Sequence, residues 1–497
     1  MMKKALLSCR LGVLMLAACD LWACAQKVKG EPRPLAFYYP LDVELAPDGT
    51  HAYVVSSNFD HRFTSGWIST IDLEEVKPRD PADGTIDGAV DGVLAPGKVI
   101  VAEGGQLSVP SLGGPLAVEP GPNGKVAVLA HRGEQVITVL AIVDGVLSCG
   151  DAESTAGLTS VEQETDCDRR HMFKLNSPAN LSAAEWGTTI PLAALNDPYA
   201  VTIFTSNGET RVAVGFLSRD SASPGLVLVY TIKLDSDPIL EPWLRVPLGS
   251  GVGTTSGASS LAVHPAGNGP TGGVRLAVGS RRLRADDLQS TVFDIDIEAM
   301  RAAPFATYAT PHGLSDVVGG FDTVDLTFLP KEASVVTSGL FAAGDFAYVA
   351  NRSPDGIAIL DARLVPSEAG RLAGQFPSRN PRYAVLDFVP LQGAPGGVIY
   401  IPRANDGDVL AALSLDNNEV DLLRVTGGQV QPAARVRDIG NGPFGSTLAT
   451  LAGHDPWLVV ATFYDHGISI VTVPKGDLTR ANCVVQIRDS SFGATAH

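Results

Sequence analysis

The chain has 497 residues and a formal net charge of −17, with 45% hydrophobic and only 18% charged residues. So acidic a chain argues against a nucleic-acid partner, because phosphate binding relies on a positive surface. The composition, with 52 Gly and 34 Pro, is typical of many short strands joined by tight turns.

The N-terminus has the pattern of an export signal. Lys3, Lys4 and Arg10 lie before an apolar run over residues 11–18. A positive segment followed by an apolar run too short to span a bilayer predicts a signal peptide rather than a transmembrane helix. We therefore expect residues 1–18 to be removed and residues 19–35 to form an N-terminal tether.

Cys19 is the expected site of lipid attachment. The preceding Leu-Ala-Ala resembles the lipobox of bacterial lipoproteins, whereas the bulky Trp22 makes the surroundings of Cys24 a poorer match. Lipidation would anchor the protein in a membrane of the bacterial cell envelope, at its periplasmic or outer-membrane face. The alternative is ordinary secretion with cleavage near Ala23.

Removal of the signal peptide takes away Cys9, and lipidation uses Cys19. Four cysteines then remain in an oxidising compartment: Cys24, Cys149, Cys167 and Cys483. Cys149 and Cys167 share one polar insertion, over about 145–190, whose composition cannot build its own core. We expect a disulfide between them, which would order that insertion. A second bridge between Cys24 and Cys483 would tie the tether to the last unit, and the alternative is a free thiol at each.

A repeat organises the remainder of the chain. Strand-like apolar segments of similar pattern recur about every 60 to 84 residues, and each is followed by a second and a third strand and by a weaker fourth. Such a period predicts an all-β, seven-bladed β-propeller with four-stranded antiparallel blades, filling residues 36–497 as one domain. The alternative fold is two consecutive β-sandwiches. The blades are expected to start near Leu41, Pro115, Tyr199, Ser259, Thr323, Tyr383 and Ser446.

Two of the repeats carry a recognisable signature. The segment FAYVANRSPDGIAILDARL, residues 346–364, resembles the YVTN-type β-propeller repeat, and residues 46–73 match it with a Pro-Asp-Gly turn ahead of the strand. The resemblance implies the propeller fold. Propellers of this type include lactonase-like proteins and exported surface or periplasmic proteins, and fold similarity alone chooses neither function.

Arginines recur at one position of the repeat, directly after the expected second strand. Because the loops after second strands line one mouth of a propeller channel, these arginines could bind an anion with their forked guanidinium groups. The other interpretation is pairing with loop acids such as Asp355 or Asp406. The candidate binding residues are Arg62, Arg132, Arg219, Arg281, Arg282, Arg352, Arg403, His61, His131 and His466.

Metal and cofactor signals are weak. Asp83, Asp87 and Asp91 recur every four residues, each before a Gly, and could offer oxygens to calcium. Asp-Gly pairs are also ordinary turn formers, which favours a solvated acidic insertion. The sequence gives no other metal candidate and predicts no cofactor.

Two functional classes remain. The first is an exported, membrane-anchored, non-catalytic propeller whose channel mouth presents a surface to an anionic small molecule or an envelope protein. The second is a lactonase-like hydrolase of a sugar-acid lactone. We favour the first, because no paired base and nucleophile can be assembled from neighbouring loops.

Overall fold

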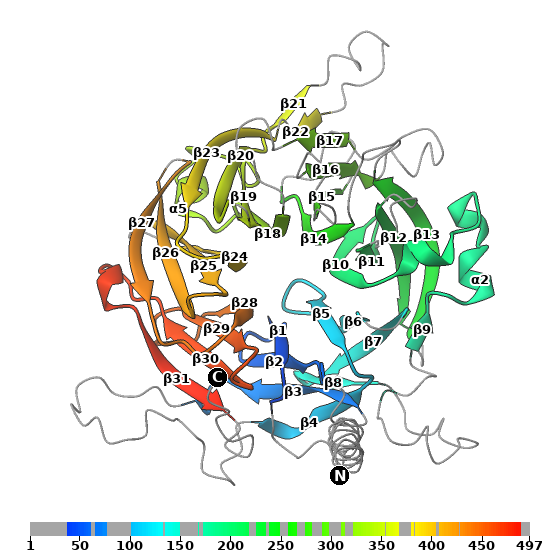
Figure 1. Cartoon of the computed structure of the whole chain (residues 1–497), viewed down its shortest axis with the longest axis horizontal. Coiled ribbons are helices and arrows are strands. Elements are labelled where there is room, and N and C mark those ends of the chain that lie inside the picture. Colours follow the sequence, from blue (N-terminus) through cyan, green and yellow to red (C-terminus); the bar gives the residue numbers. More distant parts are fainter. Residues whose placement is uncertain are drawn as a thin grey trace, which may run out of the picture.

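The computed structural model describes residues 37–60, 65–76, 101–132, 135–149, 167, 172–217, 225–234, 238–248, 257–265, 274–280, 291–297, 310–313, 322–352, 354–366, 379–381, 383–403, 407–426 and 428–488. Within these residues, seven antiparallel sheets stand as blades around a central channel (Figure 1). The predicted seven-bladed β-propeller is thereby confirmed. No helix in the described part of the chain is long and apolar enough to cross a membrane.

Each blade is built from consecutive strands, so its chain runs from the channel to the rim. Blade one contains β1 (Pro40–Leu45), β2 (His51–Ser56), β3 (Gly66–Asp72) and β4 (Val101–Val109). Blade two contains β5 (Gly113–Val118), β6 (Val126–His131) and β7 (Val136–Val143), with β8 (Val146–Ser148) and β9 (Met172–Lys174) both paired to β7. Blade three contains β10 (Pro198–Ser206), β11 (Glu209–Phe216), β12 (Gly225–Leu234) and β13 (Pro238–Leu248).

The remaining blades follow the same plan. Blade four contains β14 (Ala258–Val263), β15 (Arg275–Ser280), β16 (Thr291–Asp296) and β17 (Thr310–Gly313). Blade five contains β18 (Asp322–Phe328), β19 (Phe346–Arg352), β20 (Gly356–Asp361) and β23 (Ala384–Pro390), with a small hairpin of β21 (Leu364–Pro366) and β22 (Arg379–Pro381). Blade six contains β24 (Pro395–Ile401), β25 (Asp408–Ser414), β26 (Glu419–Thr426) and β27 (Gln429–Val436). Blade seven contains β28 (Pro443–Ala449), β29 (Trp457–Thr462), β30 (Gly467–Thr472) and β31 (Asn482–Arg488).

The sixth blade requires a correction. The repeat pattern predicts its start near Tyr383, but the strand there is β23, which pairs with β20 as the fourth strand of blade five. Blade six begins at Pro395 instead. The segment YAVLDFVPLQG has the apolar pattern of a first strand, whereas the true first strand opens with Pro-Gly-Gly and gives a weaker signal.

The apolar core is divided among the gaps between blades. Both faces of a blade must be covered, so central strands such as β6, β25 and β29 are buried along their whole length. Seven apolar clusters fill the gaps, each joining side chains of two neighbouring blades. Every gap between neighbouring blades is therefore filled by apolar side chains.

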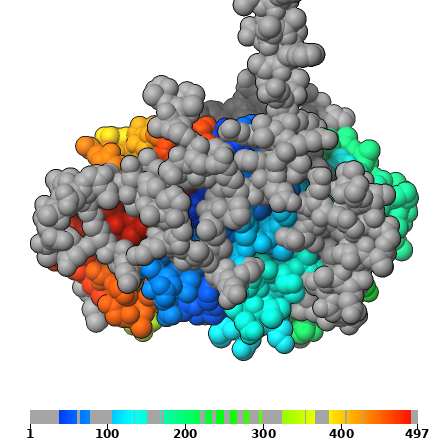
Figure 2. Space-filling model, turned by 90° about the horizontal axis from the view of Figure 1, so that it is seen from below, coloured from blue at the N-terminus to red at the C-terminus, as the bar shows by residue number. Residues whose placement is uncertain are grey.

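The ring closes between blades seven and one, and none of the described strands is exchanged between them. Figure 2, seen from the rim, shows blade seven in orange and red, blade one in blue and blade two in cyan, in that order. Trp457 and Val459 of blade seven pack with Val43 and Val54 of blade one. One polar contact also crosses this gap near the channel, since the backbone N–H of Leu45 donates to Thr447 Oγ1 over 3.2 Å.

The expected disulfide joins Cys149 and Cys167, whose Cα atoms are 5.4 Å apart. Both cysteines are buried in the apolar cluster between blades one and two. The bridge therefore joins Cys149, directly after β8, to Cys167 within this cluster. Cys24 lies outside the described residues, so its pairing with Cys483 stays a prediction; Cys483 lies half-buried on β31.

Candidate functional site

The first strands of the seven blades line the channel. The upper mouth is defined as the end of the channel at which the first strands begin, where the second strands end and the third strands start. The channel holds a cavity of about 340 Å³ with side chains from all seven first strands, and Arg132 and Arg352 contribute to its wall. A second cavity of about 280 Å³ lies at the upper mouth and shares Leu41, Arg132 and Phe444 with the first.

Arg132 directly follows β6 and is fixed by one nitrogen. Its Nε donates to Asp197 Oδ1 over 3.2 Å, and its guanidinium carbon lies 4.3 Å above the ring of Tyr199. Gly114 makes room for it, since a Cβ there would lie 2.7 Å from Arg132 Cγ. Among the described residues its two terminal Nη nitrogens bond to nothing, and the side chain is 28% exposed.

Arg352, the last residue of β19, is held in the same way. Its Nε donates to the carbonyl oxygen of Pro395 over 2.9 Å, at the start of blade six. Within the described part of the chain its Nη nitrogens also bond to no protein group. An arginine fixed through Nε presents its terminal nitrogens as a fork, the geometry that matches a carboxylate or phosphate.

Below the arginines the channel is acidic. Asp42 Oδ2 accepts from the N–H of Leu116 in the next blade over 2.8 Å, and Asp325 Oδ2 accepts from the N–H of Val398 over 2.9 Å. The two aspartates thus make the same kind of hydrogen bond to the next blade, one from blade one and the other from blade five. Each satisfies a backbone donor at the free inner edge of the neighbouring sheet.

The protonation of these carboxyl groups is shifted. Burial raises the pKa of Asp42 to about 6, although the N–H groups of Leu116 and Val43 stabilise its carboxylate. Burial also raises the pKa of Asp325. The pKa of Glu44, two residues beyond Asp42, is raised well above its usual value by burial and by the charges of the two aspartates.

Aromatic side chains gather at the upper mouth beside Arg132. Phe59, Phe444, Phe463 and Tyr464, together called the aromatic platform, all line the smaller cavity. Phe59 and Tyr464 are 57% and 60% exposed, which is unusual for such large side chains. The platform joins loops of blades one and seven, so ring closure assembles it.

Several predicted site residues lie elsewhere. Arg403 follows β24, a first strand, so it is at the opposite end of the channel from Arg132 and Arg352. It is 3% exposed there, and its guanidinium donates to the carbonyl oxygen of Pro474. The prediction that it follows a second strand is wrong, because it rested on the misplaced start of blade six.

Of the three histidines predicted for the site, the two within the described residues are each engaged by other groups. His131, the last residue of β6, is fully buried, with Nε2 2.8 Å from Thr138 Oγ1, and burial lowers its pKa to about 4. His466 Nδ1 accepts from the backbone N–H of Tyr39 over 3.1 Å, and its ring stacks on Tyr38. His466 thus links blades seven and one.

The other predicted site residues are outside the described residues. They comprise one histidine and four arginines of the loops, the lipid-attachment cysteine, and the three calcium candidates: His61, Arg62, Arg219, Arg281, Arg282, Cys19, Asp83, Asp87 and Asp91. In the described part of the chain, no three His, Cys, Asp or Glu side chains are grouped closely enough to hold a metal ion.

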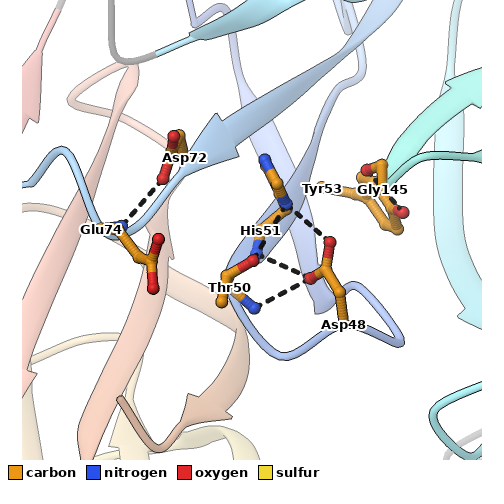
Figure 3. A network of polar contacts seen from close by, with 7 residues as sticks. All are labelled: Asp48, Thr50, His51, Tyr53, Asp72, Glu74 and Gly145. Carbon is orange, nitrogen blue, oxygen red and sulfur yellow. Dashed lines mark hydrogen bonds and ion pairs between the residues drawn. The ribbon is translucent and has the colours of Figure 1, made fainter. Parts of the chain in front are cut away.

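A histidine–aspartate pair at the lower mouth belongs to a turn. Figure 3 shows Asp48 facing His51 in the connection between β1 and β2, where Asp48 Oδ2 lies 2.7 Å from His51 Nδ1. Burial alone would raise the pKa of Asp48, but hydrogen bonds from Thr50 and His51 lower it below its usual value. These bonds shape the turn, and we assign no further role to the pair.

The sequence held signals for the groups that were missed. Asp42 and Asp325 occupy equivalent positions just after an irregularity in the first strands β1 and β18, which an alignment of the repeats would show. Phe59 and Tyr464 lie in two of the loops already singled out for their arginines and histidines. Both loops contain an aromatic residue followed by Asp-His.

Comparison with known proteins supports the fold alone. No family model matches the chain, and no curated protein sequence does. Hydrazine synthase from Kuenenia stuttgartiensis has a similar structure with a TM-score of 0.50 and 12% identity, covering 90% of this chain and 98% of that one. The β-propeller domain of Cps50 (Swd1) from Myceliophteria thermophila has a TM-score of 0.50 and 10% identity, and the match covers 88% of this chain and 97% of that one. The periplasmic gluconolactonase PpgL from Pseudomonas aeruginosa has a TM-score of 0.47 and 15% identity, covering 86% and 93%.

Proposed function

We propose that the protein is an exported, non-catalytic propeller that binds an anionic ligand, or an anionic group of a partner protein, at the upper mouth. The observation that carries this proposal is the pair of arginines in one cavity wall, Arg132 and Arg352. Each is held through Nε, and neither Nη pair bonds to a described residue. A guanidinium group that is already held in place loses little conformational entropy when a ligand binds, so the entropic cost of binding is lower.

The acidic interior limits how far an anion can enter. Asp42, Glu44 and Asp325 lie in the wall of the same cavity, deeper than the mouth. Their ionised forms repel a negative group, and in a site of reduced polarity that repulsion acts strongly. An anion is therefore favoured beside the arginines and disfavoured below them.

The hydrolase alternative gains no support from the described histidines. A general base must be able to reach a water or substrate proton. His131 is buried against Thr138, and the Nδ1 atom of His466 already accepts from Tyr39. We therefore do not propose catalysis at this mouth.

Binding can be measured by calorimetry with citrate and inorganic phosphate as probe anions at low ionic strength. Charge-assisted hydrogen bonds contribute about 1.5–3 kcal/mol each. Changing Arg132 or Arg352 to Gln should thus raise Kd by roughly 10-fold or more. Arg435→Gln serves as the matched control, because Arg435 pairs with Asp421 between the outer strands of blade six. Equal affinity in all variants would refute the proposal.

We also propose that Cys19 carries a lipid that anchors the propeller in the cell envelope. The lipobox-like sequence and the signal-like segment before it support this. Radiolabelled palmitate should label the wild type but not Cys19→Ser. Labelling that survives this change and disappears in Cys24→Ser would assign the lipid to the other cysteine.

A further inference from the structure

The smaller cavity at the upper mouth combines an apolar wall with one cation. Its charged or hydroxyl-bearing residues include Ser57, Arg132 and Asp197, and Arg132 Nε donates to the Asp197 carboxylate over 3.2 Å. The other lining residues offer carbon atoms for the most part. They are Leu41, Phe59, Leu112, Gly113, Leu415, Phe444, Phe463 and Tyr464.

The aromatic platform is held in place before any ligand arrives. The rings of Phe59 and Tyr464 meet Phe463 edge-on, with centroids 5.8 and 5.2 Å away. Phe463 in turn packs against Tyr39, at 4.9 Å. The Tyr464 ring also covers Gly442, where a Cβ would lie 2.5 Å from Tyr464 Cδ2 and where φ is +68°. Exposed rings supported in this way bind at a low entropic cost.

The lining discriminates between kinds of anion. A sugar acid carries several hydroxyl groups, and buried hydroxyls without partners weaken binding. Apart from the Tyr464 hydroxyl, the polar side chains are Ser57, Arg132 and Asp197, and each of these three already bonds within the protein. Most hydroxyls of a sugar acid would therefore stay unbonded. A planar apolar body instead gains from contact with the rings, and a volume of about 280 Å³ suits a molecule of one or two rings.

We infer that the ligand of this cavity is an aromatic acid, with its ring or rings on the aromatic platform and its carboxylate or equivalent anionic group on the Nη nitrogens of Arg132. This inference rests on the proposed function and names its ligand class. The ring contacts supply the apolar part of recognition. The guanidinium fork sets the orientation and excludes neutral analogues.

Four probes, two double variants at the surface and the single variant Arg132→Gln test the inference by calorimetry. The probes are 2-naphthoate, its neutral analogue 2-naphthalenemethanol, gluconate, and inorganic phosphate. The double variant Phe59→Ser with Tyr464→Ser removes two exposed rings. Its matched control, Leu340→Ser with Leu386→Ser, removes two exposed apolar side chains that do not line the cavity.

We expect 2-naphthoate to bind the wild type at least 10-fold more tightly than the other three probes. Both the ring variant and Arg132→Gln should weaken naphthoate binding 10-fold or more, and the control should not. If gluconate binds as tightly as naphthoate and the ring variant changes neither, the inference is overturned while anion binding stands. If naphthalenemethanol equals naphthoate, the charge-based part is overturned. If no anion binds in an arginine-dependent way, the proposed function itself fails.

Discussion

The burial of His131 should make the protein lose stability in acid. The pKa of this histidine falls from 6.5 to about 4 on folding, because burial disfavours its charged form. Protons therefore bind the unfolded chain more readily than the folded one. The contribution to stability is complete above pH 6.5 and is lost as the pH falls toward 4. At 1.36 kcal/mol for each pKa unit, the full loss is about 3 kcal/mol.

Urea unfolding followed by tryptophan fluorescence, at several pH values between 4.5 and 8, measures this loss. His131→Gln removes the titrating group while keeping a polar side chain near Thr138. The free energy of unfolding of the wild type should fall relative to this variant by about 2–3 kcal/mol between pH 7.5 and 4.5. His454→Gln, at an exposed position, should follow the wild type. A constant difference between wild type and His131→Gln across the pH range would refute the reasoning.

Three further outcomes are expected. Changing Cys149 and Cys167 together to Ser should destabilise the fold by about 3 kcal/mol, as chain entropy predicts for a loop of this size, and an unchanged melting temperature would contradict it. Gly114→Ala brings a Cβ to 2.7 Å from Arg132 Cγ, so it should weaken citrate binding by calorimetry while the fold persists by circular dichroism. The pKa of Asp42 is raised to about 6, so its stabilising effect is present at low pH and lost as the pH rises through 6. Unfolding midpoints at pH 5 and 7.5 should show the wild type losing stability relative to Asp42→Asn, and the opposite trend would be inconsistent with the shift.

The propeller could be predicted because its physical cause is periodic. Every blade needs apolar strands that are covered on both faces, and this need repeats along the chain as a visible pattern. The residue at which each repeat begins is harder to predict. β23 is an edge strand with the apolar sequence pattern of an inner strand, and β24 begins with Pro-Gly-Gly. The pattern therefore places the start of the sixth repeat one strand too early.

The site was only partly predictable, because it depends on contacts between distant segments. Arg132 and Arg352 could be identified from their own blades, since Arg132 directly follows a second strand and Arg352 is the last residue of one. The aromatic platform could not, because Phe59 and Phe463 meet only when blade seven closes onto blade one. The burial of His131 likewise depends on packing between strands, which a loop-based interpretation of the sequence overlooks.

The manner of ring closure has a consequence for the chain's connectivity. No described strand is shared between blades one and seven, and their gap is filled like every other gap. No described sheet therefore depends on which blade comes first in the sequence. A circular permutant that joins residue 488 to residue 37 by a linker and begins between β23 and β24 would keep every blade intact. Topologically the described residues thus form a cycle of seven blades, in which the first and the last blade meet like any other pair of neighbours.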